Sequence, residues 1–145
     1  MNQTKKTISF LLSIACTAAL YAESPARLEL KKGYHISLIG NTLADRMQHD
    51  GYLESFIHKA FPQNNLTFRN LGFAGDELTI RQRSEAFGSP DEWLAKNQTD
   101  VILAFFGFNE SFAGPAGLDK FNADLEKFID DTKKQKYNGN SVPRL

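Results

Sequence analysis

The stretch from Tyr34 to Met47 constrains the fold more than any other part of this 145-residue sequence. A short apolar run, Ile36 to Ile39, stops at Gly40-Asn41-Thr42, and a helix-compatible pattern begins directly at Leu43. A buried strand followed at once by a tight turn and a helix is typical of a parallel sheet, which binds ligands at the carboxyl ends of its strands. We therefore expect the turn residues to lie at a functional edge of such a sheet.

Two later segments repeat this arrangement of an apolar strand followed by glycine. Leu66 to Leu71 precedes Gly72 and Gly75, and Val101 to Phe106 precedes Gly107. Helix-compatible patterns separate the three strands, and this alternation is typical of an α/β fold with helices on both faces of a parallel sheet. We predict that strands near residues 34–39, 66–71 and 100–106 are parallel and adjacent, with the first one central.

The helices are expected from apolar periodicity and from capping residues. One runs from Leu43 to Gln48 and a second from about Tyr52 to the stop at Phe61-Pro62. Asp76 is expected to cap a short helix through Arg81, and Ser89-Pro90 begins a helix that ends near Lys96 with Trp93 facing the core. A long amphipathic helix follows Gly117 and carries Lys133, Lys134 and Lys136 in its last turns, and Val142 to Leu145 resembles the start of another strand.

The first 22 residues have the order of a secretory signal peptide. Lys5 and Lys6 precede an apolar run from Ile8 to Leu20, and Ala22 is the expected cleavage position. This predicts a secreted or periplasmic protein whose folded domain is residues 23–145. An uncleaved membrane anchor and a lipid anchor on Cys16, the single cysteine, are the alternatives.

The charge pattern argues against a nucleic-acid partner. Basic and acidic residues number 17 each, so the formal net charge is zero, and no long basic run is present. His49 and His58 fall within helix-compatible segments, where a lone histidine is usually a surface or half-buried residue rather than part of a site.

Three residues that follow the predicted strands carry the groups that acyl transfer needs. Thr42 has a hydroxyl, the backbone around Gly75 offers N–H groups, and Asn109 has a side-chain amide. Acyl transfer requires a nucleophile beside donors aimed at the developing oxyanion. Each residue also has a structural interpretation, with Thr42 as a helix N-cap, Gly75 as a turn glycine and Asn109 satisfying local backbone. The residue types alone leave both interpretations open.

Three sequence blocks occur in a fixed order, each after a predicted strand. They are Gly40-Asn41-Thr42-Leu43, then Asn70 to Asp76, then Gly107-Phe108-Asn109-Glu110. Together they resemble the SGNH, or GDSL-type, hydrolase family over residues 34–145. The resemblance implies a three-layer, flavodoxin-like fold and hydrolysis of acyl or acetyl esters, often on carbohydrates or lipids, without a metal or a cofactor.

The resemblance also implies roles for particular residues. Thr42 stands at the nucleophile position, and Gly75 and Asn109 are the oxyanion donors. Four further residues support them: Gly40, Asn41, Gly107 and Glu110.

The sequence departs from the family pattern at catalytic positions. Thr42 replaces the nucleophilic serine, and Asn41 and Glu110 replace aspartates. The Asp-x-x-His block that supplies the base is absent, and the last histidine is His58. We interpret the chain as the N-terminal part of an SGNH-like esterase domain, inactive as it stands because the last strands and the base are missing. The alternative is a non-catalytic module that binds a ligand or carbohydrate, or serves assembly within a larger secreted protein.

Overall fold

The computed structural model describes residues 27–82 and 84–145, and the predicted signal peptide, residues 1–22, lies outside these ranges. The sheet in the described part of the chain consists of β1 (His35–Gly40), β2 (Thr67–Asn70) and β3 (Val101–Phe105), in the order β2-β1-β3. Both pairings are parallel, and Ile36 lies opposite Phe68 on one side and Val101 on the other. The prediction of three adjacent parallel strands with the first one central is confirmed.

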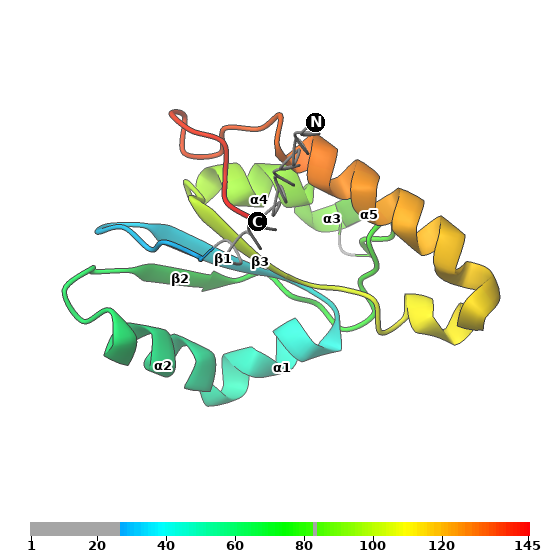
Figure 1. The fold of residues 1–145 in the computed structure, drawn as a ribbon, viewed down its shortest axis with the longest axis horizontal. Coiled ribbons are helices and arrows are strands. Elements are labelled where there is room, and N and C mark those ends of the chain that lie inside the picture. Colours follow the sequence, from blue (N-terminus) through cyan, green and yellow to red (C-terminus); the bar gives the residue numbers. More distant parts are fainter. Residues whose placement is uncertain (1–26, 83) are drawn as a thin grey trace, which may run out of the picture.

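Helices cover both faces of the sheet, as Figure 1 shows. The helices α1 (Thr42–Asp50) and α2 (Tyr52–Ala60) lie on one face. The helices α3 (Ser84–Phe87), α4 (Pro90–Lys96) and α5 (Leu118–Thr132) lie on the other. The chain therefore has the predicted three-layer α/β fold.

The two core clusters lie on opposite faces of β1. Ile36 and Leu38 pack with Val101 beneath α1 and α2, whereas Ile39 packs with Leu94 beneath α4. Because side chains alternate along a strand, a central strand covered on both sides must be apolar on both. Each fully buried aliphatic side chain of this kind stabilises the fold by about 1.5–3 kcal/mol, so β1 anchors both halves of the core.

The start of α4 follows the sequence prediction closely. The Glu92 N–H donates to Ser89 Oγ at 3.2 Å, and the Ser89 N–H donates back to Glu92 Oε2 at 2.7 Å. This reciprocal pair satisfies two backbone donors that a helix N-terminus would otherwise leave without partners. Leu94 is buried, whereas Trp93, which was predicted to face the core, is only half-buried and stacks on the Phe87 ring, with 5.2 Å between the ring centroids.

The short helix predicted after Asp76 does not form. In a helix, the Arg81 N–H would donate to the Glu77 carbonyl, but the Arg81 guanidinium donates to that carbonyl instead. The Leu78 N–H, which the Asp76 side chain would accept if Asp76 capped a helix, donates to the side chain of Glu110 at 2.9 Å. One contact within the segment and one with distant Glu110 therefore outweigh the helical pattern, and the short helix lies later, at α3.

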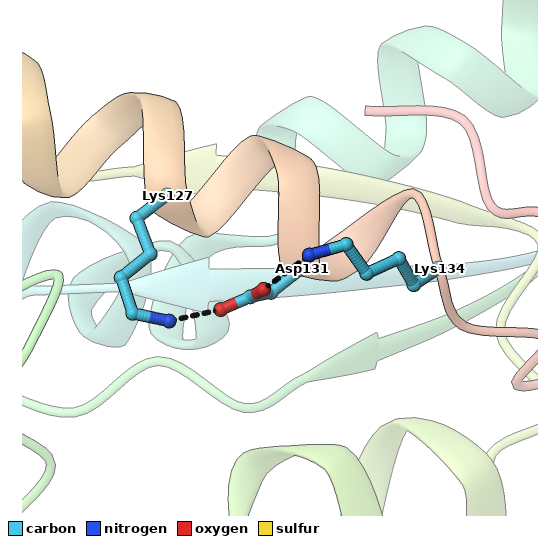
Figure 2. Close-up of polar contacts among 3 residues, drawn as sticks. All are labelled: Lys127, Asp131 and Lys134. Atoms are coloured by element: carbon cyan, nitrogen blue, oxygen red, sulfur yellow. Dashed lines mark hydrogen bonds and ion pairs between the residues drawn. The ribbon is translucent and has the colours of Figure 1, made fainter.

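The helix α5 is shorter than predicted and ends at Thr132. After it the chain turns, so that Tyr137 is buried and its hydroxyl donates to Asp91. On α5 itself, Asp131 accepts hydrogen bonds from Lys127 and Lys134 (Figure 2). These contacts lower the pKa of the Asp131 carboxyl, Lys127 contributing most. The two lysine side chains are largely exposed and Asp131 is about half exposed, so these ion pairs add little stability.

The last residues reach the free edge of β3. The Ile102 N–H donates to the Arg144 carbonyl at 2.8 Å, and the Arg144 N–H donates to the Asp100 carbonyl at 2.9 Å. Val101 and Arg144 thus form one parallel bridge, in line with the strand-like pattern of residues 142–145. Within residues 27–82 and 84–145, no helix is both long and apolar enough to cross a bilayer.

Candidate active site at the carboxyl edge of the sheet

Three loops follow the strands of the sheet, and the first, between β1 and α1, is held against the end of β3 by Gly40. Gly40 has a φ of +133°, and a Cβ at this position would lie 2.2 Å from the Phe105 carbonyl oxygen. The neighbouring Asn41 N–H donates to the same oxygen at 3.0 Å. Only glycine permits this backbone conformation and this close approach, so the sequence places the start of α1 directly beside the end of β3.

The residue that caps α1 is Asn41. Its side-chain oxygen accepts a hydrogen bond from the Leu43 N–H at 3.2 Å, and its side chain is buried. Thr42 already belongs to the first helical turn and is half-buried. The N-cap interpretation of Thr42 is therefore wrong, because the extended backbone that suits capping falls one residue earlier. Helix capping accordingly does not depend on the Thr42 hydroxyl.

The second loop packs onto α1. The Phe73 N–H donates to the Gly40 carbonyl at 2.9 Å, and the Asn70 side chain donates to the Ala44 carbonyl at 2.6 Å. A Cβ on Gly72 would lie 2.5 Å from the Ala44 Cβ, so glycine is needed here for close packing. Gly75, the predicted oxyanion donor, follows three residues later and is half-buried.

Glu110 joins the second loop to the third. Its Oε1 accepts from the Leu78 N–H at 2.9 Å, and its Oε2 accepts from the Gly107 N–H at 3.0 Å. Asn109 immediately precedes the 3₁₀ helix η1 (Glu110–Gly117). The sequence identified Glu110 as a supporting residue at a substituted aspartate position. Its role in joining the loops depends on a contact between residues 32 positions apart, which no local pattern reveals.

Arg81, in the segment between β2 and α3, is a partly buried cation. The Arg81 guanidinium carbon lies 4.2 Å from the centroid of the Phe106 ring. Burial lowers the pKa of Arg81, while the carboxylates of Asp76, Glu110 and Asp91 act in the opposite direction. Arg81 also lines a cavity of about 240 Å³ together with Leu71, Phe87 and Trp93.

The three histidines lie away from this edge. His35 is the first residue of β1, at the opposite end of the sheet, with its Nδ1 2.7 Å from the Asn97 carbonyl oxygen. His49 lies in the last turn of α1, about 10 Å along the helix axis from Thr42 at 1.5 Å per residue. His58 lies in the last turn of α2, and its ring contacts Phe68. The chain therefore brings no imidazole to the carboxyl edge.

The three loops that carry the predicted site residues leave the sheet at the same end (Figure 1). Thr42 begins α1 after β1, Gly75 lies in the loop after β2, and Asn109 follows β3. The hydrogen bonds of Gly40 and Glu110 connect these loops in pairs. That Gly75 and Asn109 point toward the Thr42 hydroxyl stays a prediction. Across the described residues, no group of three His, Cys, Asp or Glu side chains is arranged to hold a metal ion.

Comparison with solved structures finds a similar fold in a catalytic mutant of Axe2, an acetylxylan esterase from Geobacillus stearothermophilus. The TM-score is 0.56 at 15% sequence identity, and the alignment covers 74% of this chain and 57% of that one. This chain thus spans little more than half the length of that esterase chain. At this identity the likeness shows a shared α/β fold. No protein-family model matches the sequence, and no curated protein matches it.

We expect the Glu110 connection to contribute measurably to stability. Glu110→Ala removes an acceptor shared by two backbone N–H groups, and hydrogen bonds to a charged group are worth about 1.5–3 kcal/mol. The free energy of unfolding in urea should therefore fall by about 2 kcal/mol or more. Glu126→Ala, at an exposed position on α5, is the control and should change it by less than about 0.5 kcal/mol. Equal effects of the two substitutions would show that Glu110 does not hold the loops together.

Proposed function

We propose that the carboxyl edge of the sheet is the acyl-ester site of an SGNH-type ester hydrolase in a secreted or periplasmic protein. Thr42 stands at the nucleophile position, and the Gly75 N–H and the Asn109 amide are the oxyanion donors. The observation that carries the proposal is that the loops bearing these residues leave adjacent parallel strands at one edge and hydrogen-bond to one another. The fold likeness to an acetylxylan esterase supports an acyl or acetyl ester as substrate, on a carbohydrate or a small molecule.

The proposed reaction would require a proton acceptor. The Thr42 oxygen would bond to the ester carbonyl carbon, the hydroxyl proton would pass to a base, and the alcohol would leave with a proton returned by that base. A threonine hydroxyl is a weak nucleophile without such a base, and its β-methyl group further restricts its approach. Since His35, His49 and His58 all lie elsewhere, we propose that residues 27–145 bind the ester and do not turn it over.

A second candidate function is a non-catalytic binding module with the same fold. The cap geometry favours it, because Asn41 occupies the position of a family aspartate and its side chain serves the helix N-terminus. Such a module would keep the three loops as a ligand-binding site but would not need a nucleophile at Thr42.

We expect the purified chain to hydrolyse p-nitrophenyl acetate no faster than buffer does. Thr42→Ser should restore nothing, because the missing group is the base and not the hydroxyl. Thr42→Ala should be indistinguishable from both. The measurement is the release of p-nitrophenolate under identical conditions. Clear turnover that is abolished by Thr42→Ala would show that another group serves as the base.

A further inference from the structure

A second cavity lies toward the amino ends of β1 and β2, away from the proposed ester site. It measures about 300 Å³, and its lining comes from these two strands and from the residues that end α4. His35 lies opposite Thr67, and Ser37 lies opposite Arg69. Because side chains alternate along a strand, these four side chains share one face of the sheet. It is the face that α4 covers, since Ser37 Oγ lies 2.8 Å from Oγ1 of Thr99, just beyond that helix.

The charge of its lining distinguishes this cavity from two other cavities of the structure. Arg69 and Lys96 line it, and among the described residues no carboxylate does so. Asp76 lines the cavity beside Arg81, and a further cavity between α4 and α5 is lined by three aspartates. In the part of the chain that the structure describes, neither Arg69 nor Lys96 forms an ion pair. Two cations without a countercharge attract an anion into a cavity.

The hydrogen-bond acceptors near this cavity are engaged within the protein. The Asp100 carboxylate accepts from the His35 N–H at 2.8 Å and from the Asn138 side chain at 2.7 Å. The Asn97 carbonyl accepts from His35 Nδ1 at 2.7 Å. Three further carbonyls near the end of α4 accept hydrogen bonds from residues 97–99, and they belong to Trp93, Leu94 and Ala95. These bonds occupy the carbonyl groups that would otherwise repel an anion at the end of the helix.

The Asn97 side chain, in contrast, has a donor without an acceptor. Its Nδ2 is buried and donates to none of the described residues. Burial of an amide N–H group without an acceptor is costly, so such groups are normally met by water or by a ligand. Because Nδ2 gives up no hydrogen bond when the terminal amide rotates, it is free to turn toward an acceptor in the cavity that Asn97 lines.

We propose that this cavity binds a phosphate group, as the free ion or as part of a small phosphomonoester. Arg69 from β2, Lys96 from the end of α4 and the Asn97 amide supply three separate donors, which suits an ion with several oxygens. Two cations also balance the charge of a phosphate, which is about −2 at neutral pH. A nucleic acid fits less well, because the sequence has a formal net charge of zero and no long basic run. The site lies away from the carboxyl edge, so the proposal does not depend on the ester site.

The test is a titration of the isotope-labelled full chain with inorganic phosphate, followed by proton–nitrogen correlation NMR. Phosphate replaces chloride at constant ionic strength and pH, so that screening by salt does not change. The side-chain amide signals of Asn97, identified by their loss in Asn97→Asp, should shift with added phosphate until they reach saturation. Arg69→Gln and Lys96→Gln should each weaken the apparent affinity about tenfold, as expected for the loss of one hydrogen bond to a charged group.

Two further variants sharpen the test. Asn97→Asp should abolish binding, because its carboxylate repels phosphate. Should Asn97→Asp fail to fold, Arg69→Gln still decides, since the Arg69 side chain is exposed. Lys59→Gln is the matched control for Lys96→Gln and should leave the affinity unchanged, because Lys59 is exposed in the last turn of α2, on the opposite face of the sheet (Figure 1).

Three results would overturn the phosphate site. The first is the lack of any saturable shift, which would mean that only water meets Asn97 Nδ2. The second is equal weakening by Lys59→Gln and Lys96→Gln, and the third is binding of acetate as tightly as phosphate. A parallel titration with methyl phosphate shows which form is bound: affinity equal to or higher than that of phosphate supports a monoester, and lower affinity supports the free ion.

Discussion

Thr42→Cys is expected to convert the chain into an acyl acceptor. A thiol has a pKa of about 8.5 and is a few per cent ionised at pH 7, so it attacks an ester without the base that the hydroxyl needs. Thr42 lies in the first turn of α1, where the helix N–H groups lower the pKa of a thiol further. Mixing with p-nitrophenyl acetate should therefore release one p-nitrophenolate per chain, and mass spectrometry should find one acetyl group. All variants carry Cys16→Ser, so that no other thiol is present.

The matched control for this prediction is Tyr52→Cys. Tyr52 is the first residue of α2, a helix of nine residues like α1, but it lies away from the candidate site and is 69% exposed. We expect acylation to be about 10³-fold faster after Thr42→Cys, since donors aimed at an oxyanion typically contribute effects of this order. Equal rates for the two variants would mean that Thr42 has no oxyanion donors beside it.

Gly40→Ala is expected to destabilise the fold severely. The new Cβ would lie 2.2 Å from the oxygen, 2.7 Å from the carbonyl carbon and 2.9 Å from the Cα of Phe105. All three are backbone atoms of β3, which is paired with β1 and cannot move aside. Together with the strained φ of +133°, this should lower the free energy of unfolding by about 4 kcal/mol or more, measured by urea denaturation.

Gly139→Ala separates the effect of conformation from that of the steric clash. Gly139 has a φ of +77°, and no described atom lies within 4 Å of a Cβ built there. This substitution should cost about 1–2 kcal/mol, the usual penalty for a side chain in the left-handed region. If Gly40→Ala and Gly139→Ala lowered the free energy of unfolding by the same amount, the close approach of β1 to Phe105 would be contradicted.

The fold could be predicted because its determinants are local and repetitive. The apolar runs at 34–39, 66–71 and 100–106 became β1, β2 and β3, with each boundary shifted by one residue. Ser89-Pro90 and Glu92 specify the start of α4 through contacts within one helical turn. The physical cause of such patterns lies within a few residues, so the sequence alone predicts them.

The remaining features depend on contacts between distant segments. The Glu110 carboxylate, 32 residues further along the chain, accepts the Leu78 N–H where the short helix was predicted to begin, and that helix does not form. The burial of Tyr137 bends the chain after Thr132, which shortens α5. A local helical pattern cannot anticipate a partner that lies tens of residues away.

The order of the candidate site residues along the chain could be predicted from the sequence, but the contacts that hold their loops in place could not. Thr42, Gly75 and Asn109 follow three successive strands, which the sequence shows directly. That Asn41 caps α1, and that Gly72 packs on Ala44, depends on backbone angles and packing distances. These supporting contacts fix the loops on which the proposed chemistry relies.

The most direct test of the ester site is the effect of Asn109→Ala on acylation after Thr42→Cys. If the Asn109 amide stabilises the oxyanion, its loss should slow p-nitrophenolate release about 10²-fold, as removal of one oxyanion donor typically does. The same substitution in the Tyr52→Cys chain should change nothing. An unchanged rate in the Thr42→Cys chain would contradict the account, because Asn109 would then lie away from the acyl group and the three loops would not form one site.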